Sequence, residues 1–194
     1  MPVPAHAVIA AMPMPGMSAV ATRPLTTQSP PSVKTILFVC TGNTCRSPMA
    51  EGLLRHALGK TTAFRVRSAG VAAHPGAPPN PETVAVLKAS GISLENHRAK
   101  PITSDMVHDS MLILAMTAQH KEILLELFPD AAERVFLLGE FSDDPTLGDV
   151  PDPIGGGRRA YMETRDAIVS AIPSLLDFLK HSSDIEDAEA SGER

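Results

Sequence analysis

Residues 40–47 read Cys40-Thr41-Gly42-Asn43-Thr44-Cys45-Arg46-Ser47, and the interpretation of the rest of the chain depends on this stretch. An apolar run, 36–39, precedes it, and a helix-like pattern begins at Pro48. Proline is favoured in the first turn of a helix. We therefore expect a short loop that joins the end of a buried strand to the start of a helix.

Such a loop has a specific chemistry. Backbone N–H groups at a helix N-terminus have no intrahelical partner, and a small-residue loop ahead of them directs further N–H groups at the same point. A phosphate dianion fits this nest, and the same field stabilises a thiolate at Cys40, the nucleophilic form of cysteine. The guanidinium of Arg46 can bind two phosphate oxygens. Gly42 and Asn43 tolerate unusual backbone angles, and Ser47 can cap the helix or donate a hydrogen bond to the thiolate.

The octet resembles the phosphate-binding loop of the low-molecular-weight protein tyrosine phosphatase family, and the longer string 39–51 resembles its bacterial protein-arginine-phosphatase branch. The resemblance extends from about Thr35 to about Lys180 and includes Ser68-Ala69-Gly70, Ala115-Met116-Thr117 and Asp152-Pro153. It implies that Cys40 is the nucleophile and that Arg46 binds phosphate. No metal or other cofactor is implied. The remaining loop residues would bind substrate: Thr41, Gly42, Asn43, Thr44, Cys45 and Ser47.

A thiolate that accepts a phosphoryl group needs an acid that protonates the leaving atom and then, as a base, activates water. The candidate is Asp152, which Pro153 biases toward an extended conformation. The resemblance implies a general acid in this Asp-Pro motif. Spacing alone leaves three other aspartates of the same loop as alternatives: Asp143, Asp144 and Asp149.

Thr44 discriminates between two substrates. The tyrosine-phosphatase pattern has a bulky aliphatic residue there, usually Ile, whereas the arginine-phosphatase pattern has Thr, as in this chain. A hydroxyl can accept a hydrogen bond from an N–H of an arginine substrate. The alternative is that Thr44 is only a tolerated β-branched substitute. Ile154 departs from both patterns, which have an aromatic residue after the Asp-Pro motif, and it leaves the substrate open.

Two residues have two interpretations each. His97 resembles the family's buried histidine, which supports the loop through its asparagine, here Asn43; the alternative is an ordinary core or surface histidine. Cys45 either forms a reversible disulfide with Cys40 or is a small packed residue. No role is assigned to the histidines outside any motif: His56, His74, His108, His120 and His181.

The composition limits the class of protein. A chain of 194 residues with 43% hydrophobic residues suits one domain with a sizeable core. A net charge of −5 gives no general attraction to nucleic acid or to an anionic membrane, and no apolar run is long enough to span one. Both cysteines lie in the loop, which excludes a disulfide framework, a cysteine-based zinc site and a relay of three cysteines. We expect a cytoplasmic monomer that acts on phosphorylated proteins.

Strand and helix patterns alternate along the chain. Strands are expected at 35–39, 64–68, 111–116 and 135–138, and helices at 47–58, 80–91, 103–108, 117–128 and 158–180. The alternation predicts an α/β three-layer sandwich, in which a four-stranded parallel sheet has helices on both faces. The family resemblance implies the strand order 2-1-3-4. Pro173 predicts a kink or a local break in the last helix.

The two ends of the chain differ from its middle. Residues 1–33 contain no Asp or Glu and one Arg, and we expect a disordered extension. A translation start at Met17 and an acid-free transit peptide are the alternatives. The phosphatase domain is expected at 34–181, followed by a disordered acidic tail at 182–194.

The leading hypothesis is a cysteine-dependent protein phosphatase that hydrolyses phosphoarginine in proteins through a phosphocysteine intermediate. A low-molecular-weight protein tyrosine phosphatase is the first alternative. Further alternatives are an arsenate reductase that uses an external thiol and a phosphoprotein-binding module without turnover.

Overall fold

A four-stranded parallel sheet in the order β2-β1-β3-β4 forms the centre of the computed structural model, which describes residues 33–191, with side chains as far as residue 182. The strands are β1 Lys34–Cys40, β2 Phe64–Gly70, β3 Ser110–Ala115 and β4 Val135–Leu137. The predicted fold class and strand order are thereby confirmed. In the register of the sheet, Cys40 lies opposite Gly70, so the loop begins at the carboxyl edge beside a residue without a side chain.

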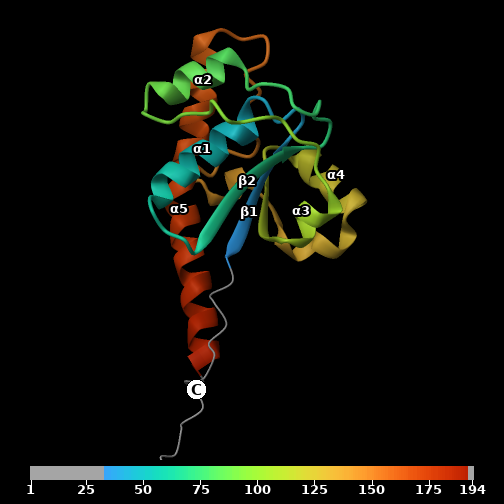
Figure 1. The fold of residues 1–194 in the computed structure, drawn as a ribbon, viewed down its shortest axis with the longest axis vertical. Coiled ribbons are helices and arrows are strands. Elements are labelled where there is room, and N and C mark those ends of the chain that lie inside the picture. The colour runs from blue at the N-terminus through green and yellow to red at the C-terminus, as the bar shows by residue number, and fades with distance from the viewer. Residues whose placement is uncertain (1–32, 192–194) are drawn as a thin grey trace, which may run out of the picture. The chain divides into compact units, whose positions relative to one another are not determined.

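Helices cover both faces of this sheet (Figure 1). One face carries α1 Arg46–Leu58, α2 Pro81–Lys88 and α5 Arg158–Ser191. The other face carries α3 Ser104–His108 and α4 Ala118–Leu127. Two 3-10 helices, η1 Pro129–Arg134 and η2 Leu138–Phe141, flank β4. This is the predicted three-layer sandwich.

The central strand β1 is buried on both faces. Its side chains alternate, so Ile36 and Phe38 pack toward α1 and α5, whereas Leu37 and Val39 pack toward α3 and α4. All four are fully buried, and each such burial stabilises the fold by about 1.5–3 kcal/mol. The packing of these four side chains therefore fixes the position of the end of β1, where Cys40 lies.

Capping residues set the N-terminal boundaries of α2 and α3, and α2 ends at Lys88, before the predicted end at residue 91. The Asn80 side chain accepts a hydrogen bond from the backbone N–H of Glu82 at 2.9 Å, and Pro81 begins α2. The backbone N–H of Asn80 in turn donates to the carbonyl of Thr44 at 2.9 Å, which ties the start of α2 to the loop. Thr103 caps α3 by accepting from the N–H of Met106 at 3.3 Å.

The last helix differs from its prediction in two respects. It continues through Pro173 without the local break, because buried Ile172 and Leu175 pack into the core on either side and keep the segment helical, while the alternative of a kink at Pro173 stays a prediction. It also continues to Ser191, so most of the segment predicted as a disordered tail from Ser182 is helical. Alanine and glutamate recur in that segment and favour helix, which its acidity alone does not oppose. Apart from residue 33, the predicted extension 1–33 lies outside the described residues.

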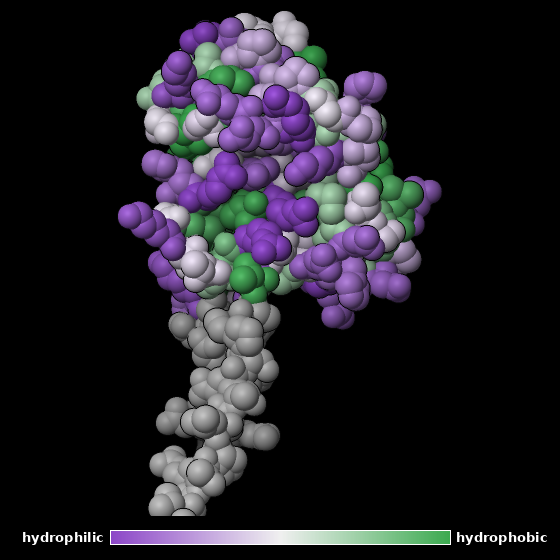
Figure 2. All heavy atoms as spheres, viewed as in Figure 1, coloured by the Kyte–Doolittle hydropathy of each residue, from purple (hydrophilic) through white to green (hydrophobic). Residues whose placement is uncertain are grey.

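The molecular surface is mixed. The face in Figure 2 is mainly hydrophilic, with smaller hydrophobic areas between the polar side chains. Within residues 33–191, no helix is both long enough and apolar enough to cross a membrane.

Candidate active site

The loop that follows β1 brings a backbone N–H and a hydroxyl into contact with the sulfur of Cys40. Cys40 is 3% exposed, and its Sγ lies 3.0 Å from Ser47 Oγ and accepts from the backbone N–H of Asn43 at 3.3 Å. Ser47 lies inside the first turn of α1, which has no side-chain cap. Of the two roles predicted for Ser47, the contact with sulfur is therefore the one present in the structure.

Asn43 gives the loop its shape. Its φ is 53°, and it is the one non-glycine residue with positive φ among those described. The buried side-chain amide donates from Nδ2 to Ser47 Oγ and to Ser68 Oγ, both at 2.9 Å, and its Oδ1 accepts from the N–H of Lys100 at 2.9 Å. Backbone freedom was expected at Gly42 as well, but Gly42 does not have a positive φ, and a Cβ there would make only an ordinary 3.7 Å contact.

Gly70, at the end of β2, is required by close packing. A Cβ on Gly70 would lie 2.5 Å from the carbonyl oxygen of Thr41 and 3.0 Å from the backbone nitrogen of Asn43. The next two residues hold the same loop, because the N–H of Val71 donates to the carbonyl of Cys40 and the N–H of Ala72 to that of Thr41, both at 2.9 Å. The small residues at the end of β2 thus let the loop lie directly against the strand.

Arg46 and Asp152 meet at the mouth of the loop. Arg46 Nη2 donates to Asp152 Oδ2 at 2.6 Å, with the arginine side chain 6% exposed and the aspartate side chain 45% exposed. The segment that carries Asp152 is fixed from both sides. The N–H of Val150 donates to the carbonyl of Met116 at 2.8 Å, and Thr164 Oγ1 of α5 donates to the carbonyl of Pro151 at 3.1 Å.

The three alternative aspartates are engaged elsewhere. Asp149 accepts from the N–H of Ala118 at 2.7 Å, at the start of α4. Asp143 accepts from Ser174 Oγ at 3.0 Å. Asp144 accepts from both the N–H and the hydroxyl of Thr146, and these hydrogen bonds lower the pKa of Asp144. Among these four carboxylates, Asp152 is the one in contact with Arg46.

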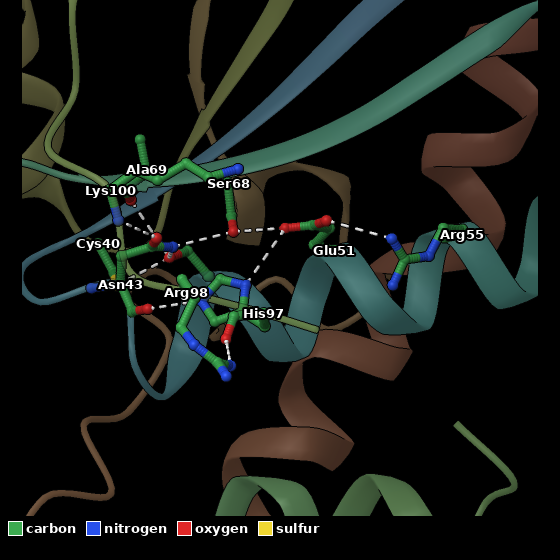
Figure 3. Close-up of polar contacts among 10 residues, drawn as sticks. Cys40, Asn43, Glu51, Arg55, Ser68, Ala69, His97, Arg98 and Lys100 are labelled. Atoms are coloured by element: carbon green, nitrogen blue, oxygen red, sulfur yellow. Dashed lines mark hydrogen bonds and ion pairs between the residues drawn. The ribbon is translucent and has the colours of Figure 1, made fainter. Parts of the chain in front are cut away.

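The predicted contact between His97 and Asn43 is present. His97 Nε2 lies 2.9 Å from the backbone carbonyl oxygen of Asn43, and His97 Nδ1 lies 4.0 Å from Glu51 Oε2 (Figure 3). Glu51 Oε2 also accepts from Ser68 Oγ at 2.6 Å. The sequence motifs included Glu51 and Ser68, but nothing in their spacing indicated that they meet.

His120, to which the sequence assigned no role, lies beside the loop. Its Nε2 is 2.8 Å from Thr41 Oγ1 and its Nδ1 is 2.7 Å from Thr117 Oγ1. Burial, and then the charge of Arg46, lower the pKa of His120, while Asp152 and Asp149 raise it. The available signal was a histidine three residues after the N-cap Thr117 of α4, at the carboxyl edge of the sheet.

Cys45 packs toward α5. It is 4% exposed, and its Sγ lies 3.7 Å from the hydroxyl of Tyr161 and 3.6 Å from Thr44 Oγ1. Burial and the contact with Cys45 raise the pKa of Tyr161. Both cysteines are free thiols in the structure. These contacts are those of a packed residue, and the disulfide with Cys40 stays a prediction.

Comparisons with known proteins give relatives over most of the chain. Residues 35–184 match the family model described as low molecular weight phosphotyrosine protein phosphatase. The chain is 42% identical over 146 residues to the protein-arginine-phosphatase of Bacillus subtilis (strain 168), which covers 75% of this chain and 96% of that protein. It is 40% identical over 136 residues to a probable low molecular weight protein-tyrosine-phosphatase, EpsP, of Ralstonia solanacearum, covering 70% and 87%.

A solved structure extends the likeness to three dimensions. The YwlE arginine phosphatase from Geobacillus stearothermophilus superposes with a TM-score of 0.71 at 38% sequence identity, covering 77% of this chain and 94% of that one.

Proposed function

This chain belongs to the low-molecular-weight phosphotyrosine protein phosphatase family, and from that premise we propose that it hydrolyses phosphoarginine in proteins. Membership of the family makes it a cysteine-based phosphoprotein phosphatase. The relatives include proteins named for arginine and for tyrosine substrates, so the choice of phosphoarginine is the proposal.

In the proposed reaction, Cys40 Sγ attacks phosphorus while the loop N–H groups and Arg46 bind the three equatorial oxygens. Asp152 protonates the leaving nitrogen as the P–N bond breaks. The resulting carboxylate then takes a proton from water, which cleaves the S–P bond and releases phosphate and the thiolate. The donors at the Cys40 sulfur and the 2.6 Å contact between Arg46 and Asp152 support these roles.

The observation that carries phosphoarginine over phosphotyrosine is Thr44. This residue is half-buried within the loop, and its carbonyl is fixed by the N–H of Asn80. Its hydroxyl lies 3.6 Å from Cys45 Sγ, and in the proposed complex it contacts the substrate atom next to phosphorus. Phosphoarginine presents an N–H there, which the hydroxyl can accept, whereas phosphotyrosine presents an ester oxygen without a hydrogen.

Ile154 removes a feature that would favour phosphotyrosine but, because it departs from both patterns, it does not itself select phosphoarginine. It is 65% exposed and follows the candidate acid by two residues, with its N–H donating to Asp152 Oδ1 at 3.1 Å. An aliphatic side chain at this position offers a phenol ring no aromatic partner to stack on.

The test compares kcat/KM for a phosphoarginine peptide and a phosphotyrosine peptide of otherwise identical sequence. Thr44→Ile should shift the ratio toward phosphotyrosine by roughly 10–200-fold, the range of one specificity contact. Thr44→Val, which removes the hydroxyl at nearly constant volume, separates the lost hydrogen bond from the added methylene. If both rates fall together in both variants, Thr44 only packs the loop, and a tyrosine phosphatase becomes the better assignment.

The remaining functional expectations are proposals as well. A cytoplasmic location is supported by two free thiols in a loop that needs its nucleophile reduced. The monomeric state is open to analytical ultracentrifugation of the full chain. The arsenate-reductase alternative predicts arsenate-dependent oxidation of an external thiol, which a coupled assay would detect.

A further inference from the structure

A second concave site adjoins the loop from the side of Asn43. It is a cavity of about 330 Å³ between α1 and the segment 93–100. The charged and polar part of its lining comes from Glu51, Arg55, Asn96, His97, Arg98 and Lys100. The face on which α1 and this segment lie together in Figure 1 is largely hydrophilic in Figure 2.

The charge of the cavity is opposite to that of the chain. Three permanent cations, Arg55, Arg98 and Lys100, face one carboxylate, Glu51, in a protein of net charge −5. The Arg98 guanidinium donates to two backbone carbonyls, at 3.1 and 2.6 Å, which hold its position without neutralising its charge. The Lys100 ammonium makes no hydrogen bond or ion pair with the residues that the structure describes. Such a lining fits a small anion.

A continuous chain of hydrogen bonds joins the cavity to the nucleophile (Figure 3). Glu51 Oε2 accepts from Ser68 Oγ at 2.6 Å, and Ser68 Oγ accepts from Asn43 Nδ2 at 2.9 Å. Asn43 Nδ2 also donates to Ser47 Oγ at 2.9 Å, and Ser47 Oγ lies 3.0 Å from Cys40 Sγ. A change at Glu51 therefore has a short, buried route to the sulfur.

Two further contacts tie the cavity wall to Asn43. His97 Nε2 lies 2.9 Å from the Asn43 carbonyl oxygen, and the N–H of Lys100 donates to Asn43 Oδ1 at 2.9 Å. Asn43 has the left-handed backbone conformation on which the loop depends. Asn43 thus contacts the cavity wall and shapes the loop at the same time, so a displacement of the wall is transmitted to the loop.

We propose that the cavity binds a small phosphate-class anion and that this binding slows turnover at Cys40. A dianion in the cavity competes with Glu51 for Arg55, which now donates to Glu51 Oε1 at 3.3 Å. It also adds negative charge near a site that must hold a thiolate and an incoming phosphoryl group. Anion binding in the cavity does not depend on the proposed function, whereas the effect on turnover rests on it.

The binding is tested by NMR of the ¹⁵N-labelled full chain during titration with inorganic phosphate. The loop amides should shift because the loop itself binds phosphate, and the amides of 93–100 should shift with a separate, independently fitted affinity. Arg98→Ala combined with Lys100→Ala should weaken the cavity affinity by about tenfold or more and leave the loop affinity unchanged. Lys60→Ala combined with Lys88→Ala removes the same charge at exposed positions outside the cavity and should change neither affinity.

Two outcomes would overturn the site. One is an absence of shifts at 93–100 in the wild type. The other is shifts there that follow the loop affinity in the wild type and in the Arg98/Lys100 variant alike, because these would be transmitted from the loop.

The coupling is tested with para-nitrophenyl phosphate as substrate. Phosphate that binds in the loop competes with substrate and leaves kcat unchanged, so a fall in kcat reports the cavity. We expect kcat of the wild type to fall by about fivefold at saturating phosphate, at the lower end of common coupling factors. Inhibition of the Arg98/Lys100 variant should be purely competitive. Purely competitive inhibition of the wild type would overturn the coupling even if the NMR titration shows a site.

Discussion

Asn43 offers the sharpest test of how the loop is held. Replacing it with alanine removes the three side-chain hydrogen bonds to Ser47, Ser68 and Lys100, all of 2.9 Å, in a fully buried position. It also places alanine at a φ of 53°, in the left-handed region that alanine disfavours. Replacement with glycine removes the same hydrogen bonds but adopts this backbone without strain.

The magnitudes follow from these two terms. Each hydrogen bond contributes about 0.5–1.5 kcal/mol net, and the left-handed conformation costs alanine about 1–2 kcal/mol. Asn43→Ala should therefore lower the free energy of unfolding by about 2.5–6.5 kcal/mol, a large part of the 5–15 kcal/mol typical of a domain. Asn43→Gly should be more stable than Asn43→Ala by about 1–2 kcal/mol.

The assay is equilibrium unfolding in urea of the full-length variants, with kcat measured on the same preparations. Both variants should lose activity, because Ser47 loses the amide that orients it. Asn96, which is exposed and does not have a positive φ, is the matched control: there, alanine should be at least as stable as glycine. Equal stability of Asn43→Ala and Asn43→Gly would refute the backbone part of the reasoning.

Three further outcomes are expected. Cys40→Ser should abolish turnover of para-nitrophenyl phosphate yet still bind phosphate, since serine is nearly the same size; turnover above background would remove Cys40 from its role. Asp152→Asn keeps an acceptor for Arg46 but no acid, so kcat on phosphoarginine should fall roughly 10²–10⁴-fold, and an undiminished rate would move the acid elsewhere. Burial and the nearby Arg46 lower the pKa of His120 below its ordinary 6.5. As the pH falls below 6.5, His120 is therefore protonated in the unfolded chain before it is protonated in the folded one, and the free energy of unfolding decreases. His120→Asn should flatten that decline in urea unfolding at pH values on either side of 6.5, whereas His108→Asn, at an exposed position, should not; a slope unchanged in His120→Asn would contradict this.

The parts of the fold that the sequence predicted well are those with local signals. The run Ile36–Val39 has no polar residue and must be buried on both faces, which identifies a central parallel strand. Asn80-Pro81 and Thr103 are N-cap signals that act within three residues, and Asn80 and Thr103 cap α2 and α3 in the structure. The octet 40–47 combines several such signals, so its place between strand and helix needed no tertiary information.

The parts that the sequence did not predict depend on contacts between distant residues. His120 reaches Thr41 only because the end of β3 lies beside the end of β1 in the sheet. Asp149 and Asp152 are the same residue type three positions apart, and only the folded chain directs one to the start of α4 and the other to Arg46. The helix beyond Ser182 was not predicted for a different reason. An acidic, polar segment cannot form a hydrophobic core, but it can still be helical.

The central claim, that this phosphatase acts on phosphoarginine, is tested most directly on the unmodified full-length protein. The measurement is kcat/KM for two peptides of identical sequence, one carrying phosphoarginine and the other phosphotyrosine at the same position. A hydrogen bond from the substrate N–H to Thr44 predicts a preference for phosphoarginine of at least about tenfold. Equal values, or a preference for phosphotyrosine, would contradict the claim.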